Sequence, residues 1–230
     1  MKVAFFDTKP YDVPGFTKYA QDAGIEIKFL ETKLNEDTAS LANGFDCVCI
    51  FVNDVANAAV VEKLYAGGVR MIALRCAGFN NVDTRACFGK IHVFRVPAYS
   101  PYAVAEHAMA LILSTLRNIP GYNEKVRKEK EWDFADAPKL YRINGMTMGL
   151  IGCGRIPRKA AVMAKGFGMK LVGYDPYLPK EVAEAAGIEL MSMEQLAAVS
   201  DVILSHVPLM PSTVKMVGKN LFDNVKKHPI

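Results

Sequence analysis

A glycine pair stands at a predicted strand–helix turn in the second half of the chain. Gly152 and Gly154 flank one cysteine, with an apolar run before them and a helical pattern after them. Glycines at such a turn permit a tight bend and let a phosphate group approach the main chain. The first N–H groups of a helix also lack partners within the helix and carry partial positive charge. The spacing therefore predicts a site for the pyrophosphate of a dinucleotide.

Asp175 ends the next predicted strand, where its carboxylate can select the dinucleotide. A carboxylate at this position accepts a hydrogen bond from the ribose 2′-hydroxyl and repels a 2′-phosphate. We therefore predict NAD rather than NADP as the cofactor. The alternative interpretation is an ordinary turn followed by an incidental aspartate.

Pro157 occupies the place of the third glycine of this fingerprint. Proline is tolerated in the first turn of a helix, because the N–H group that it lacks would have no partner there. A glycine at this place normally allows close packing of the helix on the strand. We therefore expect the ring to displace the helix outward and to weaken dinucleotide binding.

The elements that must position these residues alternate between short apolar runs and longer amphipathic runs. In the first part of the chain the predicted strands are 2–6, 25–30, 47–51, 71–74 and 92–96, and the predicted helices are 15–23, 56–65 and 82–88. Such alternation predicts a parallel sheet with helices on both faces. We expect a doubly wound α/β domain over residues 1–100.

A long helical pattern with a face of small and apolar side chains, residues 101–116, opens the second part. The predicted strands that follow are 148–151, 170–174 and 202–205, and the predicted helices are 155–166, 179–186, 193–199 and 212–227. We expect a second doubly wound parallel-sheet domain over residues 101–230. The glycine pair lies in its first strand–helix turn.

Composition excludes several classes of protein. Of the 230 residues 51% are apolar and 23% charged, which argues against a disordered chain. The net charge of +4 is small and the basic residues are dispersed, so we predict no nucleic-acid partner. No apolar run reaches the roughly 18–20 residues of a membrane span, so we predict no membrane partner. The apolar start is too short for a secretory signal, and we expect a cytoplasmic protein.

The five cysteines do not form a metal-binding or disulfide pattern. Their number is odd, and none has the spacing of zinc ligands. Cys47 and Cys49 are two residues apart in an apolar run, so they share one face of a predicted strand. We predict buried, reduced thiols and no metal site.

Several motifs, in the right order, resemble the D-isomer-specific 2-hydroxyacid dehydrogenases, and within that family the fermentative D-lactate dehydrogenases. These motifs are residues 4–11, 71–83, 96–107, 166–169 with 174–177, and 200–209. The resemblance implies a flavodoxin-like substrate-binding domain followed by a Rossmann NAD domain. It also implies reduction of a 2-keto acid by NADH, with pyruvate as the first candidate, and a homodimer packed through the helix after Pro101.

Four residues match substrate-side positions of the family: Ala77, Gly78, Tyr99 and Phe51. The resemblance assigns the substrate carboxylate to backbone N–H groups of the Ala77–Gly78 turn. Amides at the end of a strand can form such an anion site. Packing is the alternative role for Tyr99 and Phe51. Arg75 precedes the turn, and it either serves the site or forms a structural ion pair.

Further residues match positions at the NAD site of the family. Arg155 and Ile156 match residues that contact the pyrophosphate. The loop that flanks the two riboses is matched by His206, Val207, Pro208 and Thr213. The alternative role for His206 is that of an ordinary polar residue with its hydrogen bonds satisfied.

The resemblance assigns catalysis to an arginine that orients the keto acid and to a histidine, positioned by a glutamate, that donates the proton. In the family all three follow the helix that here approaches Ile230, so we expect no catalytic residue in this chain. We therefore predict that the 230 residues alone are inactive, with a C-terminally incomplete Rossmann domain from a longer enzyme. The alternative is a naturally short, non-catalytic NAD-binding interaction module of the same fold.

Overall fold

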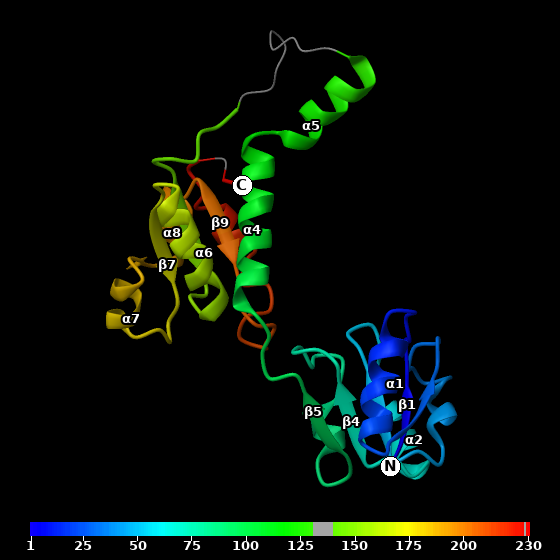
Figure 1. The fold of residues 1–230 in the computed structure, drawn as a ribbon. Helices are drawn as coiled ribbons and strands as arrows, with labels where there is room; N and C mark the ends of the chain where they lie inside the picture. The colour runs from blue at the N-terminus through cyan, green and yellow to red at the C-terminus, as the bar shows by residue number, and fades with distance from the viewer. Residues whose placement is uncertain (131–139, 228) are drawn as a thin grey trace. The chain divides into compact units, whose positions relative to one another are not determined.

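The computed structural model describes residues 1–130, 140–227 and 229–230. The chain divides into two compact units, Met1–Tyr99 and Ser100–Ile230. Each unit contains one sheet in which all the strands are parallel, so the predicted α/β fold class is confirmed (Figure 1).

The first unit is built on a sheet of strand order β2-β1-β3-β4-β5. Its strands are β1 (Lys2–Phe5), β2 (Glu26–Phe29), β3 (Cys47–Ile50), β4 (Met71–Leu74) and β5 (His92–Arg95). Its helices are α1 (Asp12–Asp22), the 3₁₀ turn η1 (Ala39–Ala42), α2 (Ala58–Ala66) and α3 (Thr84–Cys87). This is the flavodoxin-like order, which reverses between β1 and β3. Open sheets of this kind bind ligands at the carboxyl ends of the strands beside the reversal.

The central strand β3 is apolar throughout because both of its faces are covered. Val48 and Ile50 belong to one buried cluster, and Cys47 and Cys49 belong to the cluster on the opposite face. Successive side chains of a strand alternate between its faces, which explains this division. The shared face that was predicted for the two cysteines is confirmed.

The second unit begins with α4 (Pro101–Leu116), α5 (Ile119–Glu124) and the π-helical turn η2 (Lys125–Glu129). Its sheet has the order β8-β7-β6-β9. The strands are β6 (Thr147–Ile151), β7 (Lys170–Tyr174), β8 (Glu189–Leu190) and β9 (Val202–Ser205). The helices that cover it are α6 (Arg155–Gly166), α7 (Lys180–Ala185), α8 (Met193–Val199) and α9 (Lys219–Phe222). The order corresponds to strands 3-2-1-4 of a Rossmann sheet.

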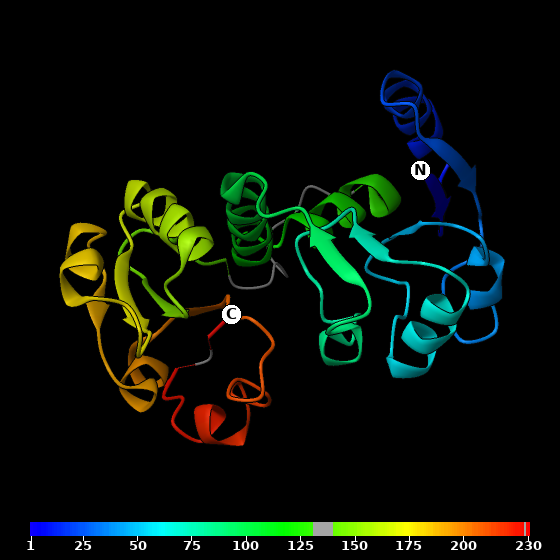
Figure 2. The ribbon, with the colours of Figure 1, turned by 90° about the horizontal axis from the view of Figure 1, so that it is seen from below.

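Helix α6 is fixed in place by a row of small residues. Ala160, Ala161 and Ala164 are fully buried, and α4 packs along the helix (Figures 1 and 2). Pro157 is the third residue of α6 and is also buried. An N–H group at that position has no partner within the helix, so the proline costs α6 no internal hydrogen bond.

One predicted helix was largely wrong. Of residues 212–227 only Lys219–Phe222 is helical. The hydroxyl of Thr213 accepts a hydrogen bond from Met210 N–H at 2.9 Å, and Lys215 adopts a positive φ of 58°. A side chain that bonds to the local backbone and a residue in the left-handed region both compete with a continuous helix. The two-residue strand β8 was missed because it is too short to show an apolar period.

Candidate functional site

The glycine pair forms the turn between β6 and α6. Gly152 has a φ of +79°, and a Cβ atom on it would lie 2.9 Å from Cγ1 of Val207 and 3.3 Å from the main chain of His206. Only glycine combines that conformation with that close approach. A Cβ atom on Gly154 would meet no atom within 4 Å. The structure therefore leaves open space at the second glycine, where a ligand can approach the backbone.

The start of α6 offers unused hydrogen-bond donors. Within the described ranges, no hydrogen bond is formed by the N–H groups of Gly154, Arg155 or Ile156. The first helical bond in this region runs from Arg158 N–H to the carbonyl of Gly154, at 3.3 Å. The dipole of a helix of 12 residues adds partial positive charge at the same place. These free amides suit the oxygens of a pyrophosphate.

Asp175 lies directly beside the glycine turn. Its Oδ2 accepts a hydrogen bond from Cys153 N–H at 2.8 Å, and its Oδ1 accepts one from Tyr177 N–H at 2.9 Å. Each carboxylate oxygen keeps a further lone pair that can accept a ribose hydroxyl. The carboxylate thus ties the end of β7 to the turn and remains able to bind a sugar.

His206 follows β9 and faces the same turn through its main chain. Its N–H donates to the carbonyl of Ile151 at 3.0 Å, while its Nε2 atom is buried and has no partner among the described residues. Burial lowers the pKa of His206, which favours the neutral imidazole. A buried ring nitrogen without a partner is uncommon and marks a place for a ligand atom. This orphaned atom, the open space at Gly154 and the free amides together fit a dinucleotide.

The loop after β9 is closed on itself by Thr213. The hydroxyl of Thr213 donates to the carbonyl of Pro208 and accepts from the N–H of Met210. Val207 from this loop lies close to Gly152. The structure therefore brings Val207 and His206 to the glycine turn and gives Thr213 a role in shaping the loop.

In the first unit, the turn after β4 offers a second set of free amides. The N–H groups of Ala77 and Gly78 make no hydrogen bond within the part of the chain that the structure describes. Their carbonyl groups are occupied, that of Ala77 by Nη1 of Arg95 at 2.8 Å and that of Gly78 by Sγ of Cys76 at 3.3 Å. A turn with engaged carbonyls and free amides is suited to a small anion.

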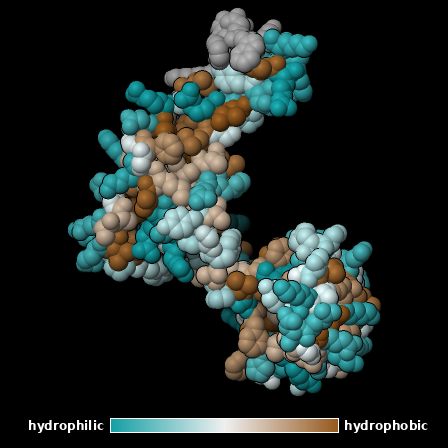
Figure 3. Space-filling view, viewed as in Figure 1, coloured by the Kyte–Doolittle hydropathy of each residue, from teal (hydrophilic) through white to brown (hydrophobic). Residues whose placement is uncertain are grey.

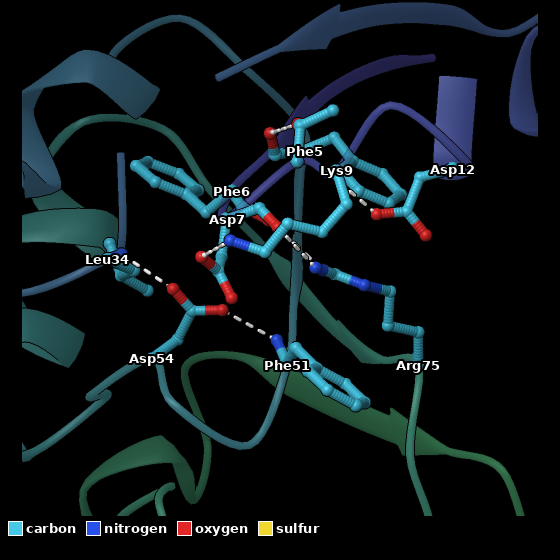
Figure 4. Close-up of polar contacts among 10 residues, drawn as sticks. Phe5, Phe6, Asp7, Lys9, Asp12, Leu34, Phe51, Asp54 and Arg75 are labelled. Carbon is cyan, nitrogen blue, oxygen red and sulfur yellow. Dashed lines mark hydrogen bonds and ion pairs between the residues drawn. The ribbon is translucent and has the colours of Figure 1, made fainter. Parts of the chain in front are cut away.

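A cavity of about 450 Å³ lies at the carboxyl ends of β1, β3 and β4, beside the reversal of strand order. It is lined by Asp7, Lys9, Tyr11, Asp12, Phe16, Phe51, Asn53 and Arg75. Arg75 forms no ion pair with any of the described residues, although an ion pair was one of its predicted roles. Its Nη1 donates to the carbonyl of Phe6 at 3.0 Å and its Nη2 to the carbonyl of Asp7 at 2.9 Å (Figure 4).

Phe51 is held by two residues that the sequence analysis did not single out. Asp54 is buried, and its carboxylate accepts hydrogen bonds from Phe51 N–H at 2.6 Å and Leu34 N–H at 2.7 Å. Asn81 donates from Nδ2 to the carbonyl of Phe51 at 2.8 Å. Burial raises the pKa of Asp54, and the two N–H groups oppose that shift. A carboxylate in the short segment after β3 was the signal that could have found Asp54.

Tyr99 and the cysteines complete the set of predicted residues. The side chain of Tyr99 is 63% exposed at the end of the first unit.

All five cysteines are free and all but Cys76 are buried; burial raises the pKa of Cys153 to about 12. Among the residues described, no group of histidine, cysteine, aspartate and glutamate could hold a metal ion. No helix in the same residues is long and apolar enough to cross a membrane.

Comparison with known proteins decides the family. Residues 109–230 match the model of the "D-isomer specific 2-hydroxyacid dehydrogenase, NAD binding domain". A D-lactate dehydrogenase from Escherichia coli (strain K12) is 39% identical over 229 residues, which are 98% of this chain and 68% of that relative. The chain belongs to the D-isomer-specific 2-hydroxyacid dehydrogenase family. The dehydrogenase is therefore an NAD-dependent oxidoreductase by family, and both the predicted family and the predicted cofactor are confirmed.

Solved structures of relatives support the fold of the dehydrogenase. The apo structure of D-lactate dehydrogenase from Escherichia coli matches with a TM-score of 0.82 and 40% identity, covering 98% of this chain and 71% of that one. A D-lactate dehydrogenase from Aquifex aeolicus, complexed with NAD and lactic acid, matches with a TM-score of 0.84 and 28% identity, covering 97% and 66%. The flavodoxin-like and Rossmann topologies predicted for the dehydrogenase are thereby confirmed.

Proposed function

We propose that the full-length protein is a D-lactate dehydrogenase that reduces pyruvate to D-lactate with NADH. The observation that carries this proposal is the turn at Ala77 and Gly78, whose free amides suit a small carboxylate. The cavity of about 450 Å³ at the same edge of the sheet fits a small substrate. The 39% identity to a D-lactate dehydrogenase supports pyruvate as the first candidate.

We propose that the two units divide this work. Residues 1–100 bind the substrate and residues 101–230 bind NAD. The support is the ligand-binding edge of each sheet, since each carries free amides where a parallel strand ends. The match of residues 109–230 to an NAD-binding family domain supports the second assignment.

In the NAD domain the amides beside Gly152 and Gly154 bind the pyrophosphate, with the side chain of Arg155 adding positive charge. Asp175 accepts hydrogen bonds from the adenosine ribose. Residues that flank the riboses and the start of the helix are Ile156, His206, Val207, Pro208 and Thr213. NADH, when bound, supplies the hydride; the residues of this chain hold and orient it.

In the substrate domain the N–H groups of Ala77 and Gly78 bind the carboxylate of the keto acid. The ring of Phe51 forms a wall beside the side chain of the keto acid. Tyr99 contributes to the substrate site from the end of the domain. The hydrogen bonds of Phe51 with Asp54 and Asn81 support a fixed wall, because they hold the backbone on both sides of the ring.

We propose that the arginine, glutamate and histidine that the family uses for catalysis lie outside the alignment, which covers 68% of the relative's length. Residues 1–230 alone then bind NAD without turning over a substrate. Residues 1–230 would then behave like a non-catalytic NAD-binding module. Turnover of a substrate by the full-length protein therefore distinguishes a dehydrogenase from such a module.

The test is NADH oxidation by the purified full-length protein with pyruvate, followed by identification of the lactate enantiomer. The proposal expects D-lactate, and it expects residues 1–230 to bind NADH without consuming it. No NADH oxidation with any 2-keto acid would exclude the dehydrogenase and leave the binding module. Activity with phenylpyruvate or 2-ketoisocaproate but not with pyruvate would correct the substrate alone.

We further propose that the protein is a cytoplasmic homodimer. Figure 3 shows apolar surface on the second unit. On α4 the side chain of Leu111 is 55% exposed, and Ile119 at the start of α5 is 54% exposed. Apolar side chains exposed together favour burial against a partner. Light scattering on the purified protein is expected to give twice the monomer mass, whereas a monomer mass would contradict the proposal.

A further inference from the structure

The Phe51 ring lies against a guanidinium group. Cζ of Arg75 lies over the ring of Phe51 at 5.1 Å from its centroid, and over the ring of Phe5 at 4.4 Å. A cation over an aromatic face is attracted by the ring's negative quadrupole. Phe51 follows β3, Arg75 follows β4 and Phe5 ends β1, so one side chain connects three adjacent strands of the sheet.

The guanidinium is itself held in one position. Its two terminal nitrogens donate to the carbonyls of Phe6 and Asp7, as Figure 4 shows. Asp7 is fixed in turn, because its buried carboxylate pairs with Nζ of Lys9 at 2.8 Å. Because the planar guanidinium bonds to two fixed carbonyls, it cannot slide along the ring. The ammonium group of a lysine is a single point of charge and would be free to slide.

Phe51 is consequently fixed by its N–H, by its carbonyl and by its ring. The N–H is bound by Asp54, the carbonyl by Asn81 and the ring by Arg75. The cavity of about 450 Å³ adjoins both Phe51 and Arg75. Without the guanidinium, the ring gains space into which it can rotate.

We propose that Arg75 is a positioning residue that fixes the Phe51 ring as the wall limiting the size of the 2-keto acid side chain. The proposal rests on the proposed function of the first unit as the substrate domain. Arg75 contacts no substrate in this account; it acts through the ring. Its loss therefore changes the choice between small and large keto acids more than the stability of the fold.

Arg70 provides a matched control at the other end of β4. Its guanidinium lies over the ring of Tyr65 at 4.2 Å, and its Nη1 donates to the carbonyls of Tyr65 and Val69, each at 2.8 Å. The chemistry of the contacts is the same as at Arg75. Arg70 precedes the strand, however, so it lies at the opposite edge of the sheet from the cavity.

The test compares Arg75→Met with Arg70→Met in the full-length protein. The measured quantity is kcat/KM for 2-ketoisocaproate divided by kcat/KM for pyruvate. Arg75→Met is expected to raise this ratio about tenfold, the scale on which a pocket discriminates by one or two methylene groups. KM for pyruvate rises and KM for the larger acid falls. Arg70→Met leaves the ratio unchanged, and Arg75→Lys gives an intermediate value and also serves if Arg75→Met does not fold.

A second measurement follows the ring itself. With 4-fluorophenylalanine in place of Phe51, the wild-type protein is expected to give one sharp fluorine resonance, and Arg75→Met a broadened or divided one. An unchanged ratio or an unchanged resonance in the Arg75 variants would each overturn the proposal. If the wild-type protein reduces no 2-keto acid, the proposed function fails, and the resonance alone decides whether Arg75 positions the ring.

Discussion

The two turns to which we assign anions present free amides in different ways. Each follows a parallel strand and presents free amides, at Gly154–Ile156 in the second unit and at Ala77–Gly78 in the first. In the second unit the backbone conformation makes the site, since Gly152 has a positive φ and the start of α6 supplies the donors. In the first unit side chains make it, because Arg95 and Cys76 engage the carbonyls of the turn.

Because of this difference, substitutions are expected to act differently at the two turns. A turn that depends on glycine conformation fails when any side chain is added at its tight point. A turn supported by side chains tolerates an added methyl group in its fold and is damaged when its supporting residues change. Substitutions at the two turns therefore distinguish a dependence on glycine conformation from a dependence on supporting side chains.

The largest effect is expected for Gly152→Ala. The new Cβ atom would lie 2.9 Å from Val207, at a φ of +79°, and the left-handed conformation alone costs about 1–2 kcal/mol. We expect a loss of about 2 kcal/mol or more in the free energy of unfolding by urea, and loss of NADH binding in a fluorescence titration. Gly154→Ala is the control, because its Cβ would meet nothing within 4 Å. It should weaken NADH binding while leaving stability nearly unchanged; equal stability losses in both variants would contradict the account.

Asp175→Ala is expected to weaken NAD binding about tenfold and to reduce the preference against NADP. In the proposed NAD site the carboxylate accepts the ribose hydroxyl, and it also holds Cys153 N–H in the turn. Loss of a hydrogen bond to a charged group costs about 1.5–3 kcal/mol. Titration with both dinucleotides checks this. Unchanged affinity for both would show that Asp175 does not contact the cofactor.

Gly78→Ala tests the turn in the first unit. A Cβ atom there would meet no atom within 4 Å and φ is not positive, so stability should stay within about 0.5 kcal/mol. The methyl group nevertheless stands beside amides assigned to the substrate, and kcat/KM for pyruvate should fall about tenfold. A large loss of stability would mean that this turn, like that of the second unit, depends on glycine conformation.

Acid should destabilise the second unit through His206. Burial lowers the pKa of this histidine in the folded protein, so the unfolded chain binds its proton first as the pH falls. The contribution of His206 to the free energy of unfolding is therefore complete above pH 6.5, the ordinary pKa of histidine. It declines as the pH falls below that value. His206→Gln should flatten the dependence of the urea midpoint on pH, and an unchanged dependence would contradict this expectation.

The smallest effect is expected for Pro157. The sequence predicted a displaced helix, while the structure shows the proline buried at the third position of an intact α6. If the proline ring keeps the helix away from the strand, Pro157→Gly should tighten NAD binding a few-fold. If the missing N–H group is the cause, Pro157→Ala should also tighten it, because a single hydrogen-bond donor is worth about 1 kcal/mol. Equal affinity in all three proteins would show that the proline is harmless.

Much of the fold could be predicted because its signals are local. The apolar runs give β3, β4 and β7, and the Gly152–Gly154 spacing gives the turn, since each depends on residues close together in sequence. Arg75 and Asn81 could not be assigned in the same way. Their partners are up to 69 residues away, and no spacing in the chain reports such contacts. The turns in 212–227 were missed for a local reason, because one threonine hydroxyl and one left-handed residue interrupt the helical pattern.

An amide NMR titration of residues 1–230 with NAD shows directly whether the glycine turn binds the dinucleotide. Shifts are expected at Gly154, Arg155 and Ile156 and at the amides bound to Asp175, with none at Ala77 or Gly78. Unmoved resonances at the start of α6, or shifts confined to the turn of the first unit, would contradict the assignment of the dinucleotide to the glycine turn.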